Sequence, residues 1–239
     1  MRLEARDHVP EWLTFLVPIL AIFFSLFVAA ILLIIADAPP LESFYYLIKG
    51  AFGSKNAIAE TGARATPLIL TGLAAGIAFR AKFWNIGAEG QLYAGAIAVT
   101  VVGTGAINLP STFMIPFLFL VGALAGAVAI LPSVILKQLF KVDEVVTTLL
   151  MNFIIILFVS FVLDGPLKDP MSMGWPQAAS IVDSGVLPQI MERTRLHFGF
   201  IVAIVTALMI WFILGKTTFG FKIRAVGYNS SAAYHSGHS

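Results

Sequence analysis

Long hydrophobic runs separated by short polar stretches dominate the pattern of this chain. The run from Thr14 to Ala36 carries no charged residue over 23 positions. As a helix rising about 1.5 Å per residue it would be roughly 34 Å long, enough to cross a hydrocarbon layer of about 30 Å. It is also too long for a signal peptide. Segments that could cross or enter a bilayer are predicted at 14–36, 65–79, 85–103, 112–136, 145–163 and 198–214. The pattern therefore predicts an all-α fold, a polytopic transmembrane helical bundle of about six membrane segments.

Composition agrees with a membrane protein. Hydrophobic residues make up 59% and charged residues 12% of the chain, whereas soluble domains carry about 25% charged residues. The absence of cysteine excludes disulfides and thiol chemistry. The net charge is only +2 and the basic residues are spread between hydrophobic runs, which gives no indication of nucleic-acid binding. The lipid bilayer is the expected partner.

The distribution of Lys and Arg predicts the orientation. If the N-terminus with Arg2 and Arg6 is cytoplasmic, nine basic residues lie on the cytoplasmic side and six outside, as the positive-inside rule requires. The two longer outside connections are then 37–64 and 164–197. The second contains four prolines and is predicted to be an ordered extracytoplasmic loop. It either connects two helices, which we favour, or meets a binding protein.

A polar cluster opens the third hydrophobic segment, with Asn85, Glu89 and Gln91 beside Gly87 and Gly90. Polar side chains are costly in a bilayer, so they should face protein, a cavity or the interface. A short hydrophobic segment followed by a glycine-rich polar start is typical of the discontinuous helices that line transport pathways. The cluster either lines such a pathway or caps the third helix at the cytoplasmic surface.

A second polar cluster begins the fifth segment. Asp143 and Glu144 precede a hydrophobic run, where acidic residues cap a helix N-terminus. Thr148 and Asn152 are four residues apart and share a helical face. Asn152 lies within the apolar run and needs a partner for its amide. Hydrogen bonding between helices is the favoured role of this face, and substrate contact is the alternative.

Two further features concern helix packing. Pairs of small residues at a spacing of four, Gly72 with Gly76 and Gly122 with Gly126, favour close packing within the bundle over a specific dimer contact. Pro132 is expected to kink the fourth helix or to end it early.

The stretch after the last hydrophobic run is basic and is therefore predicted to be cytoplasmic. Asn229, Ser230 or Ser231 can cap a short helix over residues 232–235, and Gly237 would end it. Such a helix could bind lipid headgroups or insert into a partner protein.

Several motifs resemble one family. Phe-Trp-Asn-Ile-Gly-Ala-Glu-Gly-Gln at 83–91 and Phe-Gly-Phe-Lys-Ile-Arg-Ala-Val-Gly at 219–227 resemble permeases of ABC importers for branched-chain amino acids, ribose and nucleosides. Asp-Glu-Val-Val-Thr-Thr-Leu-Leu-Met-Asn at 143–152 and Gly-Pro-Leu-Lys-Asp-Pro at 165–170 look most like the nucleoside, or simple-sugar, branch.

The resemblance implies a permease subunit of an ATP-driven importer in the cell membrane. Its partners would be a separate ATPase subunit that binds the ATP, an extracytoplasmic substrate-binding protein and a second permease subunit, and the permease itself would need no cofactor. Residues 1–214 would form the transmembrane domain and 215–239 a cytoplasmic coupling loop. By resemblance, the ATPase contact falls on Phe219, Gly220, Arg224, Gly227, Asn229, Ala232 and Ala233. The substrate pathway is expected at Asn85, Glu89, Gln91, Thr148 and Asn152, whose polar groups suit nucleosides and sugars alike.

Other classes are weaker. The chain has no Gly-x-x-x-x-Gly-Lys-[Ser/Thr] loop to hold nucleotide phosphates, and its four histidines show no metal-ligand spacing, so enzymatic chemistry is not expected. An ion-coupled secondary transporter would require charges inside helices, where only Glu89 is available. The family continues beyond the coupling loop where this chain ends at Ser239, so we expect a C-terminally shortened permease. A fragment of that permease without transport function is the remaining alternative.

Overall fold

The structure is a computed structural model that describes residues 10–105, 107, 109–235 and 237. These residues form helices joined by short connections and one long loop. They group into two compact units, Met1–Thr61 and Gly62–Ser239, which are described separately.

The first unit contains α1 (Glu11–Ile35), α2 (Pro40–Phe52) and the first turns of α3 (Lys55–Arg80). A turn with Asp37 at φ 54° separates α1 from α2, and Pro40 occupies the first helical position of α2, where its missing N–H costs nothing. The Thr61 hydroxyl donates to the Ala51 carbonyl at 2.9 Å and so ties α3 to the end of α2. The connection predicted at 37–64 is therefore largely helical.

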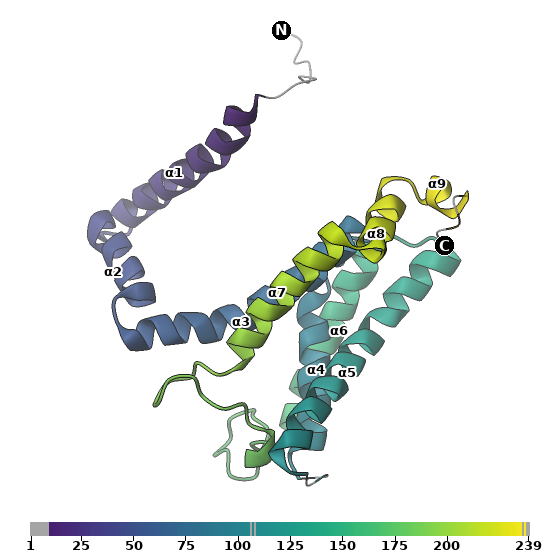
Figure 1. Cartoon of the computed structure of the whole chain (residues 1–239). Coiled ribbons are helices and arrows are strands. Elements are labelled where there is room, and N and C mark those ends of the chain that lie inside the picture. Colours follow the sequence, from purple (N-terminus) through teal and green to yellow (C-terminus); the bar gives the residue numbers. More distant parts are fainter. Residues whose placement is uncertain (1–9, 106, 108, 236, 238–239) are drawn as a thin grey trace. The chain divides into compact units, whose positions relative to one another are not determined.

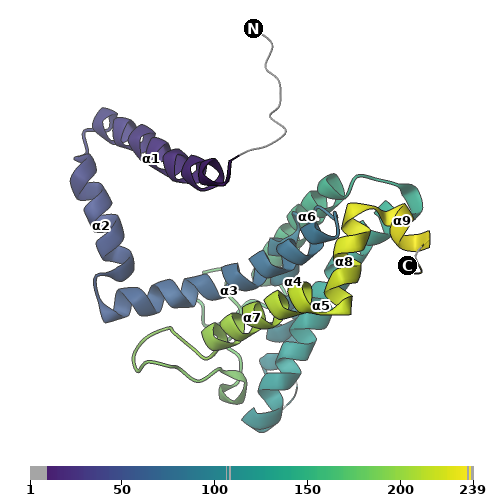
Figure 2. The same ribbon diagram turned by 45° about the horizontal axis from the view of Figure 1, so that its top comes forward.

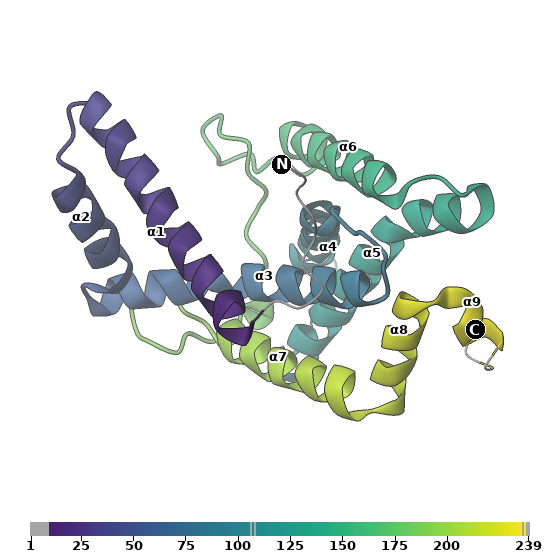
Figure 3. The same ribbon diagram turned by 90° about the horizontal axis from the view of Figure 1, so that it is seen from above.

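The second unit holds the rest of α3, then α4 (Ala88–Gly103), α5 (Ser111–Phe140), α6 (Glu144–Asp164), the 3-10 turn η1 (Asp183–Gly185), α7 (Gly199–Lys216), α8 (Thr218–Tyr228) and α9 (Ser230–His235). Helices α4, α5 and α6 pack against one another (Figure 1). Figure 2 shows the same group from a second direction. Helix α8 turns away from the end of α7, and α9 follows it (Figure 3).

Helix α4 meets α5 through glycine. A Cβ on Gly95 would lie 3.0 Å from the Gly122 carbonyl oxygen, and one on Gly122 would lie 3.2 Å from Val99 Cγ2. The small-residue pattern at Gly122 thus serves packing between helices of the same chain, as expected. A Cβ on Gly72 or Gly76 would meet nothing within 4 Å.

Among the described residues, five helices are long and apolar enough to span a membrane: Phe15–Ile35, Lys55–Arg80, Ser111–Phe140, Glu144–Asp164 and Gly199–Lys216. The predicted second segment was too short, because α3 continues as regular helix through the charged residues before it. Helix α4 has only 16 residues, roughly 24 Å at about 1.5 Å per residue.

The expectation that Pro132 could end its helix early is wrong, since α5 runs through Pro132 to Phe140. One missing N–H does not stop a helix whose other backbone groups have no better partner in lipid.

The long loop between α6 and α7 is ordered, as predicted. Isolated antiparallel bridges join Lys168 to Ala178 and Gln189 to His197. The Val182 N–H donates to the carbonyl of Gly103, the last residue of α4, at 2.8 Å. This part of the loop therefore lies against the end of α4.

Candidate functional site

The chain leaves helical conformation between Arg80, the end of α3, and Ala88, the start of α4. We call the non-helical residues 81–87 the broken segment. Lys82 has φ 53°, in the left-handed region. The segment predicted at 85–103 is therefore helical from Ala88 onward, after a non-helical polar start. A break of this kind leaves backbone N–H groups without helical partners, and in a membrane protein they must find partners within the protein.

Side chains of α6 supply those partners. Glu144, Thr148 and Asn152 are spaced four apart and share one face of α6. The Trp84 N–H donates to Glu144 Oε1 at 3.3 Å. The Ile86 N–H donates to Thr148 Oγ1 at 3.2 Å. We call this face, together with Asn85 and Gln91, the polar seam.

The seam continues into the first turn of α4. The Gly90 N–H donates to Asn152 Oδ1 in a short hydrogen bond. Asn85 and Gln91 exchange two side-chain hydrogen bonds, with Gln91 Nε2 donating to Asn85 Oδ1 at 3.0 Å and Asn85 Nδ2 donating to Gln91 Oε1 at 3.3 Å. The same Asn85 oxygen accepts the Gly87 N–H at 2.9 Å. Asn85 thus holds Gly87, the residue before α4, from a buried position.

Glycine permits this close approach. A Cβ on Gly87 would lie 2.9 Å from the Thr148 carbonyl oxygen, and one on Gly90 would lie 2.8 Å from Asn152 Oδ1. Thr148 is 1% and Asn152 7% exposed, so neither could move aside into open space. The two glycines singled out from the sequence are the positions where α4 and α6 come closest at the seam.

An ion pair lies at the end of the seam where α6 begins. Lys137 Nζ lies 2.5 Å from Glu144 Oε1 and donates to the Lys82 carbonyl at 3.3 Å. Asp143 caps α6 by accepting the Val145 N–H at 2.7 Å, which confirms its predicted role. Glu144 does more than start the helix, because it joins the end of α5 to the broken segment. The sequence analysis did not identify Lys137. Its position across a short turn from Glu144 was a usable signal for an ion pair.

Glu89 stands apart from the other predicted pathway residues. It lies in the first turn of α4, where an acidic side chain suits the helix dipole, and it is exposed. The structure therefore brings Asn85, Gln91, Thr148 and Asn152 together and leaves Glu89 outside the seam.

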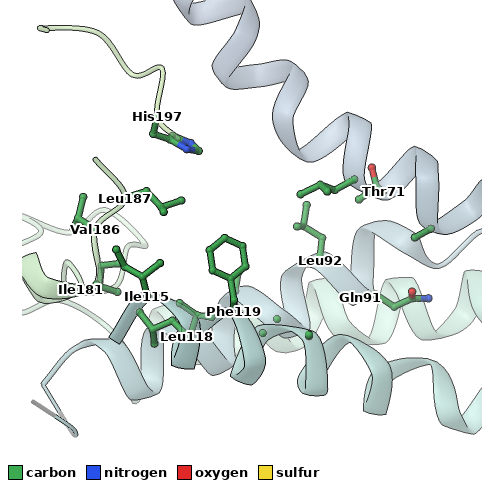
Figure 4. A pocket seen from close by; sticks show the side chains of 18 of the residues that line it. Thr71, Gln91, Leu92, Ile115, Leu118, Phe119, Ile181, Val186, Leu187 and His197 are labelled. Carbon is green, nitrogen blue, oxygen red and sulfur yellow. The ribbon is translucent and has the colours of Figure 1, made fainter. Parts of the chain in front are cut away.

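A pocket of about 810 Å³ adjoins the seam. Residues of α3, α4, α5 and the long loop line it, most of them apolar (Figure 4). Gln91 belongs to both the seam and the pocket, and Thr71 and His197 are the other polar side chains labelled there. His197 Nδ1 accepts the Gly199 N–H at 3.1 Å, so a neutral ring carries its proton on Nε2. Thr71 and His197 were not predicted, because no local pattern distinguishes them.

The chemistry available here is hydrogen bonding in an apolar surround. In the part of the chain that the structure describes, no group of three or more His, Cys, Asp or Glu side chains could hold a metal ion.

Residues 217–235 contain α8 and α9. We call them the docking segment, after the contact that the sequence analysis expects of them. Thr217 Oγ1 accepts the Gly220 N–H at 3.1 Å, and Asn229 Oδ1 accepts the Ala232 N–H at 3.0 Å. The predicted cap at Asn229 is confirmed. Gly237 follows α9 with φ 81°, as expected of a glycine that ends a helix.

The predicted coupling residues fall into two groups. Gly220, Gly227 and Ala233 are buried, whereas Phe219, Asn229 and Ala232 are exposed and Arg224 is half-buried. A Cβ on Gly227 would collide with the Arg80 carbonyl oxygen and would lie 3.4 Å from Ala81 Cα. Helix α8 therefore rests on the chain where the broken segment begins.

These features define a multi-pass helical membrane protein with a broken segment held by its neighbour. Residues 57–239 match the family described as branched-chain amino acid transport system / permease component, and the chain belongs to this family. It is 37% identical to the guanosine ABC transporter permease protein NupP of Bacillus subtilis over 94% of this chain and 64% of that protein.

Other relatives agree. The chain is 31% identical to a glucose ABC transporter permease protein of Haloferax volcanii, over all of this chain and 65% of that protein. It is 30% identical to the nucleoside ABC transporter permease protein NupB of Lactococcus lactis, over 93% of this chain and 63% of that protein. The chain thus spans slightly less than two thirds of the length of these relatives. No solved structure matches it.

Proposed function

We propose that the chain is a transmembrane permease subunit of an ATP-driven ABC importer for nucleosides or simple sugars. The observation that carries the proposal is the family match over residues 57–239, which includes the broken segment, the polar seam and the docking segment. The relatives named above are permease proteins for guanosine, glucose and nucleosides.

The substrate pathway is proposed to run along Asn85, Glu89, Gln91, Thr148 and Asn152. Gln91 supports this placement because it lies both in the seam and in the pocket. The pocket volume of about 810 Å³ is within the range of roughly 300–1,000 Å³ usual for small-molecule sites. Buried amides and a hydroxyl can exchange their present hydrogen bonds for those of ribose or sugar hydroxyls.

The remaining assembly is proposed from the family. An ATPase subunit that binds and hydrolyses ATP would dock on residues 215–239 beneath the transmembrane domain of residues 1–214. The exposed Phe219, Asn229 and Ala232 would contact it directly, with Arg224 at their edge. A substrate-binding protein would meet the outer face, and a second permease subunit would complete the pair. The N-terminus would be cytoplasmic and the membrane that of the cell.

The buried residues of the docking segment suggest how a movement of α8 on ATPase binding would be transmitted to the polar seam. Gly227 contacts Arg80 and Ala81, and the next residues of the broken segment are tied to Glu144 and Lys137. A displacement of α8 would therefore act on the broken segment first. Gly220, Gly227 and Ala233 would position the docking surface and would not contact the ATPase.

Transport in proteoliposomes tests the function. The chain is reconstituted with its ATPase and binding protein, and uptake of radiolabelled guanosine and glucose is measured with ATP or with a non-hydrolysable analogue. ATP-dependent uptake of either is expected. ATP-independent uptake that is driven by an imposed ion gradient would identify a secondary transporter. The absence of uptake under every condition would contradict a transport function for this chain.

Docking is tested by copurification. Ala232→Trp adds bulk on an exposed position of α9 and should abolish copurification with the ATPase. Leu139→Trp, at another exposed position near the end of α5, is the matched control and should leave copurification intact. Equal copurification of both variants with the ATPase would rule out α9 as the docking site.

A further inference from the structure

Helix α2 is amphipathic and short. At about 100° per residue, its large apolar side chains fall on one arc and its polar and small residues on the other. The apolar arc consists of Leu41, Phe44, Tyr45, Leu47, Ile48, Ala51 and Phe52. The opposite arc consists of Glu42, Ser43, Tyr46, Lys49 and Gly50. Its 13 residues span roughly 20 Å, too little to cross a bilayer.

Most of the apolar arc is open within the first unit, where only Phe44 and Ala51 of the arc are half-buried. None of the residues of α2 is buried, and Leu41 is 85% exposed and Ile48 61% exposed. A row of large apolar side chains this open needs an apolar partner.

The length of the neighbouring helix α1 indicates that this apolar partner is the lipid bilayer. The apolar part of α1, Phe15–Ile35, has 21 residues and measures roughly 32 Å, the full thickness of a hydrocarbon layer. The turn at residues 36–39 therefore lies at the membrane surface, and α2 begins there. After α2, the next helix long and apolar enough to span the membrane is α3, Lys55–Arg80, so the chain re-enters the bilayer only after α2 has ended. Both ends of α2 are thus held at one face of the membrane.

We infer that α2 lies in the plane of the membrane, with its apolar arc in the boundary between the acyl chains and the lipid headgroups on the side where α1 ends. The aromatic side chains suit that depth, since Tyr is enriched at membrane interfaces. Lys49 Nζ lies 5.4 Å from the Tyr45 ring centroid and 5.9 Å from that of Tyr46. The ammonium is thereby held over the rings at the edge of the polar arc, where headgroup phosphates lie.

Single cysteines test this placement, because the chain has no native cysteine. Leu41→Cys and Ile48→Cys report on the apolar arc, and Ser43→Cys and Gly50→Cys report on the polar arc. A Cβ on Gly50 meets nothing within 4 Å. Phe24→Cys in the middle of α1 is a reference for deep lipid. Each variant of the full chain is labelled with bimane and reconstituted in phosphatidylcholine–phosphatidylglycerol vesicles. Quenching is measured with aqueous iodide, with a nitroxide lipid labelled near the headgroup and with one labelled near the acyl terminus.

The expected pattern alternates with the helix. The shallow nitroxide should quench the apolar-arc labels about twofold more than the polar-arc labels, and iodide should do the reverse. The deep nitroxide should quench only the Phe24→Cys label strongly. Equal iodide quenching of both arcs would place α2 in water. Apolar-arc labels that neither lipid quencher reaches would show that protein covers them, and strong quenching by the deep nitroxide would place α2 inside the bilayer. Any of these three results would overturn the inference.

Discussion

Helix α4 is held by its two neighbours in opposite ways. Against α5 the contact is made by glycine, and a Cβ on Gly95 would lie only 3.0 Å from the Gly122 carbonyl oxygen. Against α6 the contact is made by polar side chains, which accept backbone N–H groups from the broken segment and the first turn of α4. In lipid, helices associate by close packing and by hydrogen bonds. Against α5, α4 uses close packing alone, and against α6 it adds hydrogen bonds to a close approach at Gly87 and Gly90.

The difference follows from what each neighbour must satisfy. Alongside α5, α4 is regular helix and its backbone bonds are internal, so α5 only has to come close. Alongside the start of α6, the chain of α4 is not yet helical, so α6 has to supply acceptors. The α5 contact should therefore depend on side-chain volume alone, and the α6 contact on hydrogen-bonding capacity as well.

The strongest test of this comparison removes an acceptor from the seam. Asn152→Leu keeps the approximate size but leaves the Gly90 N–H without a partner in a buried site. We expect a loss of about 2–3 kcal/mol in stability, measured as a lowered midpoint of thermal unfolding in detergent. Ser160→Ala is the control on the same helix, because Ser160 is exposed and bonds only to its own helix. An unchanged midpoint for Asn152→Leu would mean that the Gly90 N–H does not depend on the seam.

The second test adds volume on the other side of α4. Gly95→Val would bring a side chain to the Gly122 carbonyl, and overpacking of this kind costs about 2 kcal/mol. The unfolding midpoint should fall, and limited proteolysis of the connection between α4 and α5 should become faster. Gly72→Val is the matched control, since a Cβ there meets nothing within 4 Å. Equal effects of the two glycine substitutions would show that helix propensity, and not the α5 contact, is responsible.

The same contrast explains what could be predicted from the sequence. Membrane helices and caps depend on neighbouring residues, so the apolar runs, the Asp143 cap and the Asn229 cap were found from local patterns. Spacing of four also placed Thr148 and Asn152 on one face. The partners of that face lie about sixty residues earlier in the chain, as with the bond from Trp84 to Glu144, and no local pattern encodes such a pairing. For this reason the partners of the chain before α4 and the pocket were missed. Lys137 is a different case, because its partner Glu144 is only seven residues away and the pair left a local signal that was overlooked. Helix α2 was missed for a different reason, because charged residues on both sides made its segment look like a plain connection.

The smallest expected effect concerns the ion pair at the end of the seam. The side chains of Lys137 and Glu144 are 34% and 12% exposed, so water and salt screen their attraction and a pair of this kind contributes about 0.5 kcal/mol. Lys137→Met should lower the unfolding midpoint slightly, and the difference from the parent should shrink as salt is raised. Glu144→Gln retains an oxygen for the Trp84 N–H and should cost no more. A double-mutant cycle isolates the coupling between the two side chains. A coupling well above this size would show that the pair is shielded from solvent in the membrane, and the seam would then rest on charge at this end as much as on its neutral hydrogen bonds.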